Sequence, residues 1–135
     1  IKIKEMLNKF FNSFKTVMVV EDDIINQKLI RRFLNNLEVD VQIVSCGFEA
    51  IDKVKEQRFD IIFMDLQMPE IDGIETTEKI LAYFKEVALS PPKIIGLSAN
   101  ILDKDIEQSF RVGMVEYLTK PISTQKLKSV LEKWT

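Results

Sequence analysis

The sequence of 135 residues predicts an α/β domain in which helices cover both faces of a parallel β-sheet. Three observations lead to this prediction. Short aliphatic runs, most of them rich in β-branched residues, recur along the chain. A segment with the three- and four-residue apolar spacing of a helix follows each run. The connections are short and there is no internal repeat, which is typical of alternating strand and helix units.

The predicted strands are short and apolar, as strands buried on both faces should be. The third run is the most apolar, so we expect it at the centre of the sheet. The expected strands are residues 16–20, 39–44, 60–64, 93–97 and 115–119.

Each predicted helix has an apolar stripe on one side and polar residues on the other. The prolines at 91–92 stop the third helix, because proline cannot continue a helix. Gly113 is expected just beyond the fourth helix, and Ser123 can cap the fifth. The helices are expected within residues 30–37, 48–57, 74–88, 103–112 and 123–134.

Residues 1–15 are predicted to form an amphipathic linker helix ahead of a domain that spans residues 16–135. The segment carries four Lys and one Glu, and its apolar residues recur at helical spacing. We expect this helix to pack on its own domain or on a neighbour. A membrane-surface helix is the less favoured alternative, because the polar face is only modestly basic. No run approaches the roughly 18 apolar residues that a membrane span requires.

The composition excludes several classes of function. The chain carries 19 basic and 21 acidic residues, for a net charge of −2, which argues against general nucleic-acid binding. It contains no His, which removes Ser-His-Asp triads, His-ligated zinc and His general bases. The single Cys46 cannot form an internal disulfide, so the chain fits a reducing compartment and we expect it in the cytoplasm.

Polar and charged residues follow four of the five predicted strands. Glu21 and Asp22 come after the first, Asp65 after the third, Ser98 after the fourth and Lys120 after the fifth. Because the carboxyl ends of parallel strands meet at one edge of the sheet, where such folds bind ligands, these side chains should gather there. Clustered carboxylates repel one another unless a cation occupies the site. Their hard oxygen ligands favour Mg²⁺ or Mn²⁺ over zinc.

This set of groups matches what phosphoryl transfer requires: a metal ion, a cationic side chain and a hydrogen-bond donor around the charged oxygens. The nucleophile is expected to be a carboxylate, since no His can serve, and Asp65 is the predicted one because it lies at the tip of the central strand. Each feature also has an ordinary structural explanation. Asp22 or Asp23 could cap a helix, Lys120 could be a solvated loop residue and Ser98 could make a local turn. Their joint occurrence at the strand ends favours the functional interpretation.

Several segments resemble the receiver domain of the response regulators of two-component signalling. The segment at residues 63–73 contains the highly specific pattern Met-Asp-x-x-Met-Pro-x-x-Asp-Gly. The resemblance implies a flavodoxin-like, doubly wound sheet with strand order 2-1-3-4-5, five flanking helices and the added N-terminal helix. Glu21-Asp22, Asn26 and the Leu-Ser-Ala-Asn segment at residues 97–100 resemble receivers of hybrid sensor histidine kinases more than those of DNA-binding regulators. The matching segments are residues 19–23, 63–73, 95–100 and 117–121.

The resemblance implies a role for each residue of the acidic site. Asp65 would accept a phosphoryl group from a phosphohistidine on a partner, either a histidine kinase or a His-phosphotransfer protein, since this chain has no His of its own. Asp22, Asp65 and the backbone carbonyl of Gln67 would ligate Mg²⁺, and Glu21 would do so mostly through water. Gln67 and Asn100 occupy positions that tune the lifetime of the acyl phosphate.

The resemblance also implies a switch. Lys120 would pair with the phosphoryl group, and the Lys120–Pro121 bond is expected to be cis. Ser98 would move to hydrogen-bond the phosphoryl group, and Tyr117 would rotate inward with it. The face formed by residues 103–134, whose first helix has only a thin apolar stripe, would then change shape for an output domain or a homodimer.

Two other functions fit parts of the sequence. A degenerate receiver would act only as a protein-interaction module, but the expected acids and Lys120 are all present. A hydrolase of the aspartyl-phosphate type shares an Asp nucleophile and Mg²⁺, but it needs a substrate-covering cap, for which 135 residues leave no room. We therefore expect a signalling switch that catalyses only its own phosphorylation and dephosphorylation, from a response regulator or a hybrid histidine kinase.

Overall fold

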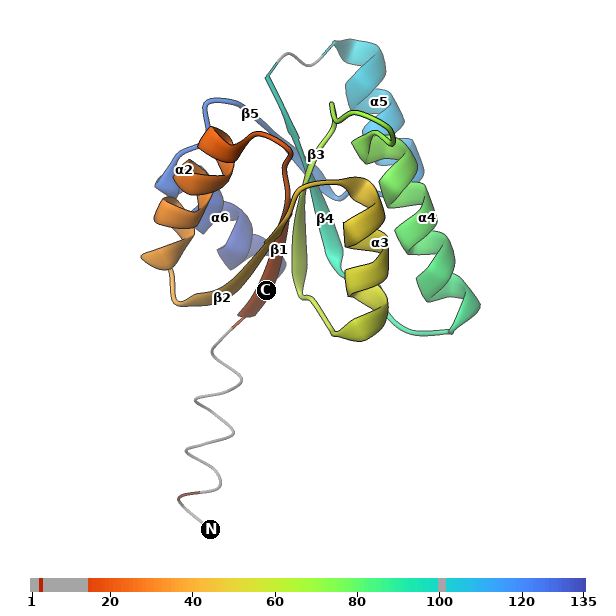
Figure 1. Ribbon diagram of the computed structural model, residues 1–135, viewed down its shortest axis with the longest axis horizontal. Coiled ribbons are helices and arrows are strands. Elements are labelled where there is room, and N and C mark those ends of the chain that lie inside the picture. Colours follow the sequence, from red (N-terminus) through yellow and green to blue (C-terminus); the bar gives the residue numbers. More distant parts are fainter. Residues whose placement is uncertain (1–2, 4–14, 100–101) are drawn as a thin grey trace.

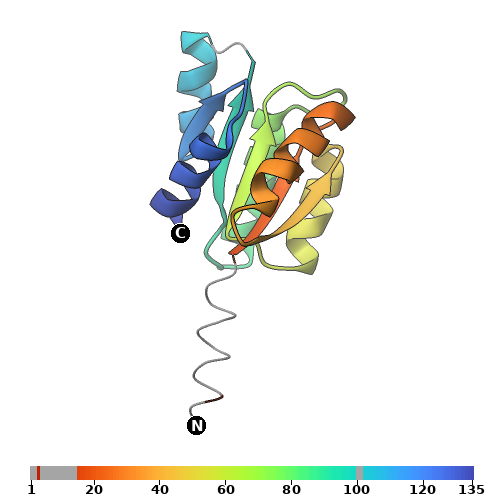
Figure 2. The same cartoon turned by 90° about the vertical axis from the view of Figure 1, so that its left-hand side faces the viewer.

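The computed structural model describes residue 3, residues 15–99 and residues 102–135. A five-stranded parallel sheet lies at its centre in the order β2-β1-β3-β4-β5, with helices on both sides (Figures 1 and 2). The fold class and strand order are as predicted, and the third strand is central. The strands are β1 (Lys15–Val20), β2 (Val39–Val44), β3 (Ile61–Asp65), β4 (Lys93–Ser98) and β5 (Glu116–Thr119). The helices are α2 (Ile24–Asn35), α3 (Gly47–Glu56), α4 (Gly73–Glu86), α5 (Asp103–Val112) and α6 (Thr124–Trp134).

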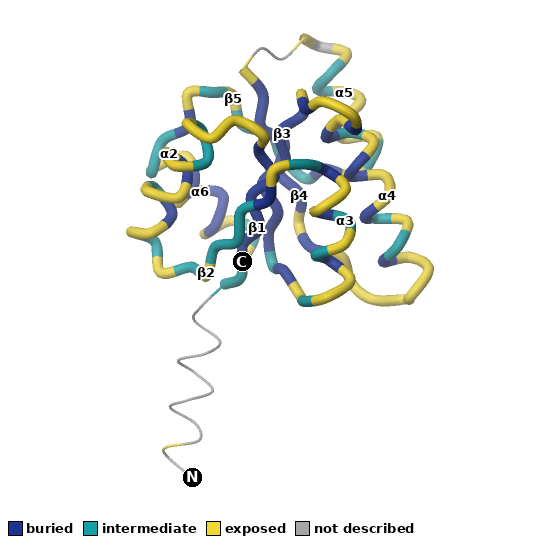
Figure 3. Tube along the Cα trace, viewed as in Figure 1, coloured by how far each residue is buried: buried dark blue, intermediate teal, exposed yellow. Residues whose placement is uncertain are grey.

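Each face of the sheet has its own hydrophobic core. On one face, Met18 and Val20 of β1 pack with residues of α3 and α4. On the other face, Val17 and Val19 of the same strand pack with residues of α2 and α6. This division follows from the alternation of side chains along a strand. Every residue of β3 is consequently buried, as the dark centre of the trace in Figure 3 shows.

The long helix α4 is shorter than predicted. It ends at Glu86, and Ala88 has already left the helix with a φ of 57°. The N–H of Leu89 donates to the carbonyl of Phe84, and the N–H of Ala88 donates to the carbonyl of Lys85. These two bonds form the closing pattern of a helix that ends in a left-handed residue. The chain therefore turns before it reaches the two prolines.

Two other helix ends agree with the prediction, and the start of α2 does not. Gly113 follows α5 with a φ of 114°, and the Ser123 side chain caps α6. The first helix begins earlier than its apolar stripe, which starts at Ile30. The Asp23 side chain caps α2, so that helix starts at Ile24.

The helix α5 is the least anchored of the five. Among its described side chains only Ser109 is buried, and the Ser109 hydroxyl donates to the carbonyl of Asp105. The apolar stripe is even thinner than predicted, because Leu102 and Phe110 are 55% and 47% exposed. Phe110 instead rests edge-on against Tyr117 of β5, with ring centroids 5.9 Å apart.

The predicted N-terminal helix lies outside the described residues, apart from residues 3 and 15. Lys15 belongs to β1, so the sheet begins one residue earlier than expected. In the described part of the chain, no helix has the length and apolar character needed to cross a membrane.

Gly73 brings the start of α4 against the loop that follows β3. A Cβ atom at this position would lie 2.2 Å from the carbonyl oxygen of Asp65 and 2.8 Å from the Cα of Leu66. Both contacts are with backbone, so a side chain would force the loop away from the helix. Glycine is therefore required here for a close approach of two backbone segments.

Replacing Gly73 by Ala should lower the free energy of unfolding by about 1–3 kcal/mol, because the added methyl group overpacks against backbone. Urea denaturation monitored by circular dichroism measures this loss. Gly96→Ala is the matched control, since its added Cβ would meet the flexible Met114 side chain at 3.0 Å. Equal losses in the two variants would contradict the explanation.

Candidate functional site

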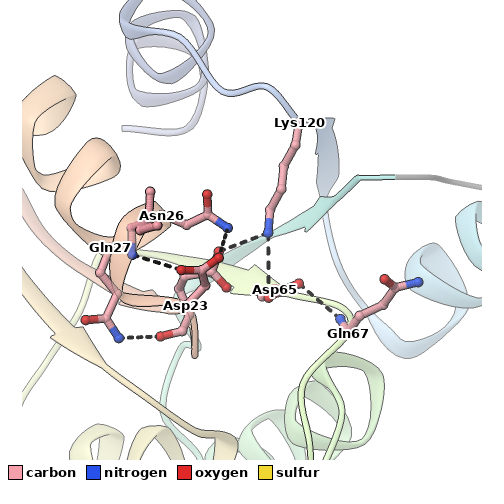
Figure 4. Close-up of polar contacts among 8 residues, drawn as sticks. Asp23, Asn26, Gln27, Asp65, Gln67 and Lys120 are labelled. Carbon is pink, nitrogen blue, oxygen red and sulfur yellow. Dashed lines mark hydrogen bonds and ion pairs between the residues drawn. The ribbon is translucent and has the colours of Figure 1, made fainter.

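The structure brings the predicted site residues together at the carboxyl edge of the sheet. Glu21 and Asp22 follow β1, Asp65 ends β3, Ser98 ends β4 and Lys120 follows β5. Figure 4 shows Lys120 reaching across the site to Asp65, with Gln67 on the opposite side of Asp65. The carboxylates of Glu21, Asp22 and Asp65 and the ammonium of Lys120 lie together there, as expected for residues that follow parallel strands.

Three carboxylates form the acidic part of the site. Glu21, Asp22 and Asp65 each offer an oxygen that lies within 4.8 Å of the other two. Glu21 is fully buried and Asp65 is 5% exposed, whereas Asp22 is exposed. The cluster is therefore closed on the protein side and open to solvent on the side of Asp22.

Lys120 partly compensates the two buried acids. Its Nζ lies 2.9 Å from Glu21 Oε1 and 3.7 Å from Asp65 Oδ2. The Lys120 side chain is only 20% exposed. Burial works against its charge, but the contacts with Glu21 and Asp65 outweigh burial and raise the pKa of Lys120. The ammonium is thus held in its charged form between two strand ends.

The two buried carboxylates differ in how they hold protons. Burial, and next the neighbouring Glu21 carboxylate, raise the pKa of Asp65 to about 8. Burial also opposes the charge of Glu21, but its contacts with Asp65 and Lys120 prevail and lower the pKa of Glu21. A single Lys cannot neutralise two buried carboxylates, so the metal-free cluster keeps a proton on Asp65 at neutral pH.

The donor set fits a hard divalent cation. Glu21 Oε2 is buried and accepts no hydrogen bond at ordinary geometry from any described residue. Burying an acceptor without a partner costs folding free energy unless a cation or a water molecule binds to it. The available ligands are carboxylate oxygens, which suit Mg²⁺ or Mn²⁺. A bound divalent cation would replace the proton on Asp65 and supply the missing positive charge.

The loop after β3 orients Asp65. The N–H of Gln67 donates to Asp65 Oδ1 at 3.1 Å, which leaves Oδ2 on the side of Lys120. The N–H of Leu66 continues the sheet by donating to the carbonyl of Leu97, and the N–H of Gly73 donates to the carbonyl of Leu66. One backbone bond thus holds the Asp65 carboxylate, and the two bonds of Leu66 hold the loop that provides it.

The remaining predicted residues are placed around this centre. Ser98 is buried, and its carbonyl accepts a hydrogen bond of 2.8 Å from the N–H of Lys120. The Lys120–Pro121 peptide bond is cis, as expected. Tyr117 is half-buried beside Phe110. Asn100 lies outside the described residues.

The sequence did not indicate one residue that contacts the acidic loop, which we define as residues 21–23 between β1 and α2. The side-chain nitrogen of Gln27, in the first turn of α2, donates to the backbone carbonyl of Glu21 at 2.6 Å and to the Ser45 hydroxyl at 3.2 Å. Its neighbour Asn26, noted above only for the resemblance, lies 3.4 Å from the Asp23 carboxylate. In the sequence, Gln27 is only a polar residue shortly after three acids. Many solvent-exposed helices begin in the same way, so this pattern does not single it out.

The chain belongs to the response regulator receiver domain family, whose model matches residues 17–132. Among curated relatives, it is 36% identical over 119 residues to the sensor protein GacS of Pseudomonas syringae pv. syringae, covering 88% of this chain and 13% of that protein. It is 36% identical over 124 residues to the osmosensing histidine protein kinase SLN1 of Saccharomyces cerevisiae, covering 87% of this chain and 10% of that protein. This chain is therefore similar to a small part of much longer kinases.

Solved structures give the same family. One is the receiver domain of the sensor histidine kinase PA1611 from Pseudomonas aeruginosa, which has a magnesium ion in its active-site cleft. It matches this chain with a TM-score of 0.77 and 33% identity, and the match covers 89% of this chain and 96% of that one. The Ssk1 receiver domain of Saccharomyces cerevisiae, in complex with the histidine phosphotransfer protein Ypd1, matches with a TM-score of 0.84 and 30% identity, covering 90% and 89% of the two chains.

Asp65 makes the metal-free domain less stable as pH rises. Its pKa of about 8 in the folded state lies above the ordinary value of 3.8, so its contribution is complete at acidic pH and is lost as pH rises through about 8. In EDTA, Asp65→Asn should therefore be more stable than the wild type, with a gap that widens from pH 6 to pH 8 and reaches on the order of a few kcal/mol.

Urea denaturation in EDTA at a series of pH values measures this gap. Asp52→Asn on the exposed side of α3 is the control and should follow the wild type. Added Mg²⁺ should narrow the gap, because an ion that binds only the folded wild type stabilises it. A gap that does not change with pH would show that Asp65 keeps no extra proton.

Proposed function

We propose that this domain is a phosphorylation-controlled signalling switch in which Asp65 accepts a phosphoryl group from a phosphohistidine on a partner protein. The observation that carries the proposal is the geometry of one cluster: three carboxylates within 4.8 Å, with the Lys120 ammonium against two of them. The family to which the chain belongs supports the same function.

Asp65 is the proposed nucleophile because it is the carboxylate that the loop backbone orients. One oxygen is held by the N–H of Gln67 and the other lies on the side of Lys120. In the transfer, an Asp65 oxygen bonds to phosphorus while the N–P bond of the phosphohistidine breaks. The imidazole nitrogen keeps the electron pair of that bond. Asp65 would react as the carboxylate, because the cation would already have replaced its proton, and within this chain only the new O–P bond would then form.

We propose that Lys120 and a divalent cation together compensate the negative charge of the transferred phosphoryl group. Lys120, now paired mainly with Glu21 at 2.9 Å, would pair with the phosphoryl oxygens. Asp22, Asp65 and the backbone carbonyl of Gln67 would hold Mg²⁺, or Mn²⁺ in its place, and Glu21 would hold it through water. The bound ion supplies positive charge that neutralises the developing negative charge on the transferring oxygens.

The proposed switch lies on the side of α5. Ser98 would hydrogen-bond the phosphoryl group, and Tyr117 would move inward with it. Because few side chains of α5 are buried, a change at Ser98 has little packing to overcome there. The face of residues 103–134 would then bind an output domain or a second copy. Gln67 and Asn100 are the proposed determinants of the lifetime of the phosphoryl group.

The proposed partner is a histidine kinase or a His-phosphotransfer protein of the cytoplasm. Ile24 and Ile25 at the start of α2 are 63% and 75% exposed, and Leu29 on the same helix is 39% exposed. Leu29 also lines a cavity with Lys120 and Pro121, so this apolar surface borders the phosphoacceptor site. A donor that brings phosphohistidine to Asp65 must cover this rim. The domain would catalyse its own phosphorylation and dephosphorylation and act on no external substrate.

Incubating the chain with Mg²⁺ and acetyl phosphate should add the mass of one phosphoryl group, because a small phosphodonor needs only the assembled site. Intact-mass spectrometry detects the product. Asp65→Asn should remain unlabelled, and EDTA should abolish labelling of the wild type. Absence of label on the wild type, or label that survives Asp65→Asn, would refute the proposed function.

Ile25→Ser should slow transfer from phosphorylated Ypd1 by about tenfold, as expected for an apolar contact at the centre of an interface, while labelling by acetyl phosphate stays unchanged. Radiolabel transfer between the purified proteins measures the rate. Leu89→Ser is the matched control, since Leu89 is 62% exposed but follows α4 at the opposite edge of the sheet. Equal rates in both variants, or wild-type transfer no faster than from phosphoimidazole, would contradict this docking surface.

A further inference from the structure

The side chain of Gln27 lies next to the acidic site and has no part in the proposed phosphoryl transfer. Gln27 lies in the first turn of α2, where its backbone N–H donates to the carbonyl of Asp23 at 2.9 Å. Its side chain turns back over the loop after β1 and donates to the carbonyl of Glu21 at 2.6 Å and to the hydroxyl of Ser45 at 3.2 Å. Figure 4 shows the Gln27 carboxamide beside the acidic loop. It thus connects α2, the end of β1 and the segment after β2.

The chemistry of the partner fixes the orientation of this carboxamide. A backbone carbonyl can only accept a hydrogen bond, so the atom that faces Glu21 O at 2.6 Å must be the nitrogen of Gln27. The second hydrogen of the same nitrogen is directed to Ser45. Both donor positions of Gln27 are therefore occupied, and the half-buried side chain is held at two points.

The bond to Glu21 acts on the peptide that joins the two adjacent acids of the site. The carbonyl of Glu21 and the N–H of Asp22 belong to one planar peptide unit. The N–H of Glu21 is held separately, since it donates to the carbonyl of Val44 at 3.1 Å. With both ends of Glu21 fixed, the direction in which the chain leaves toward Asp22 is also fixed.

Asp22 depends on this restraint more than its neighbours do. Glu21 and Asp65 are held by Lys120, and Asp23 accepts the N–H of Ile25 at 2.8 Å as the cap of α2. Within the described ranges, no residue holds the exposed Asp22 carboxylate by a hydrogen bond or ion pair. The position of Asp22 is therefore set through its backbone, and the Gln27 side chain holds the carbonyl of the peptide that joins Glu21 to Asp22.

We propose that Gln27 is a positioning residue for the divalent-cation site: its clamp on the Glu21–Asp22 peptide places the Asp22 carboxylate beside Glu21 and Asp65. The proposal rests on the proposed function only in assuming that the acidic cluster binds Mg²⁺. Groups that orient metal ligands without touching the metal typically contribute about ten- to a hundredfold to metal affinity. Gln27 would act through Asp22 and would not contact the phosphoryl group.

The test is the Mg²⁺ dissociation constant of Gln27→Met, measured by isothermal titration calorimetry on the whole chain. Met keeps the length of Gln but cannot donate, so binding should weaken by about tenfold. Ser45→Ala removes only one of the two acceptors and should weaken binding by roughly two- to threefold, in line with the loss of one hydrogen bond.

Gln42→Met is the matched control for stability. Gln42 of β2 also donates a side-chain hydrogen bond of 2.6 Å, in this case to Gln57 at the end of α3. Both Met variants should lose similar thermal stability, but only Gln27→Met should lose Mg²⁺ affinity. In labelling by acetyl phosphate, Gln27→Met should need more Mg²⁺ for half-saturation and should reach the wild-type rate at saturating Mg²⁺.

The two proposals fail in different ways. A folded Gln27→Met that binds Mg²⁺ as tightly as Gln42→Met would overturn the positioning role and leave the phosphoacceptor role intact. Should Gln27→Met not fold, wild-type affinity in Ser45→Ala would overturn the role instead. Failure of acetyl phosphate to label the wild type would refute the proposed function, whatever the Mg²⁺ affinity of the variants.

Discussion

The site depends on one interaction, the ammonium of Lys120 shared between the carboxylates of Glu21 and Asp65. Glu21 is fully buried, and a buried carboxylate without a partner would cost several kcal/mol. Lys120 supplies that partner at 2.9 Å from a position 99 residues away in the chain. One cation between two buried acids still leaves a deficit of positive charge, which explains both the proton on Asp65 and the suitability of the cluster for a divalent ion.

The parallel sheet makes this interaction possible. Because all five strands run in the same direction, the residues that follow β1, β3 and β5 lie at the same edge. The hydrophobic cores on the two faces hold the strands rigidly, so the charged side chains are brought together at little further cost in entropy. At this edge the chain also makes close backbone approaches, as at Gly73, and these fix the loop that orients Asp65.

The domain is not equally rigid on all sides of the site. The loop after β1 is held by the cap of α2 and by Gln27, and the loop after β3 by the start of α4. The helix α5, by contrast, buries only Ser109 among its described side chains and leaves Phe110 on the surface beside Tyr117. A firm acidic pocket next to a lightly packed helix suits a domain in which a small change of charge must alter a larger surface.

Local apolar spacing was enough to predict the five strands, the presence of the five helices and their parallel arrangement, and the meeting of parallel strand ends was enough to place the acids, Ser98 and Lys120 at one edge. Three features of the site came from the folded chain alone: Lys120 lies nearer Glu21 than Asp65, the pKa of Asp65 is the one that rises, and Gln27 holds the loop after β1. The end of α4 before Ala88 and the exposure of Phe110 were likewise beyond the sequence. These features depend on distances, burial and backbone angles set by segments far apart in the chain, which apolar periodicity and residue type do not encode.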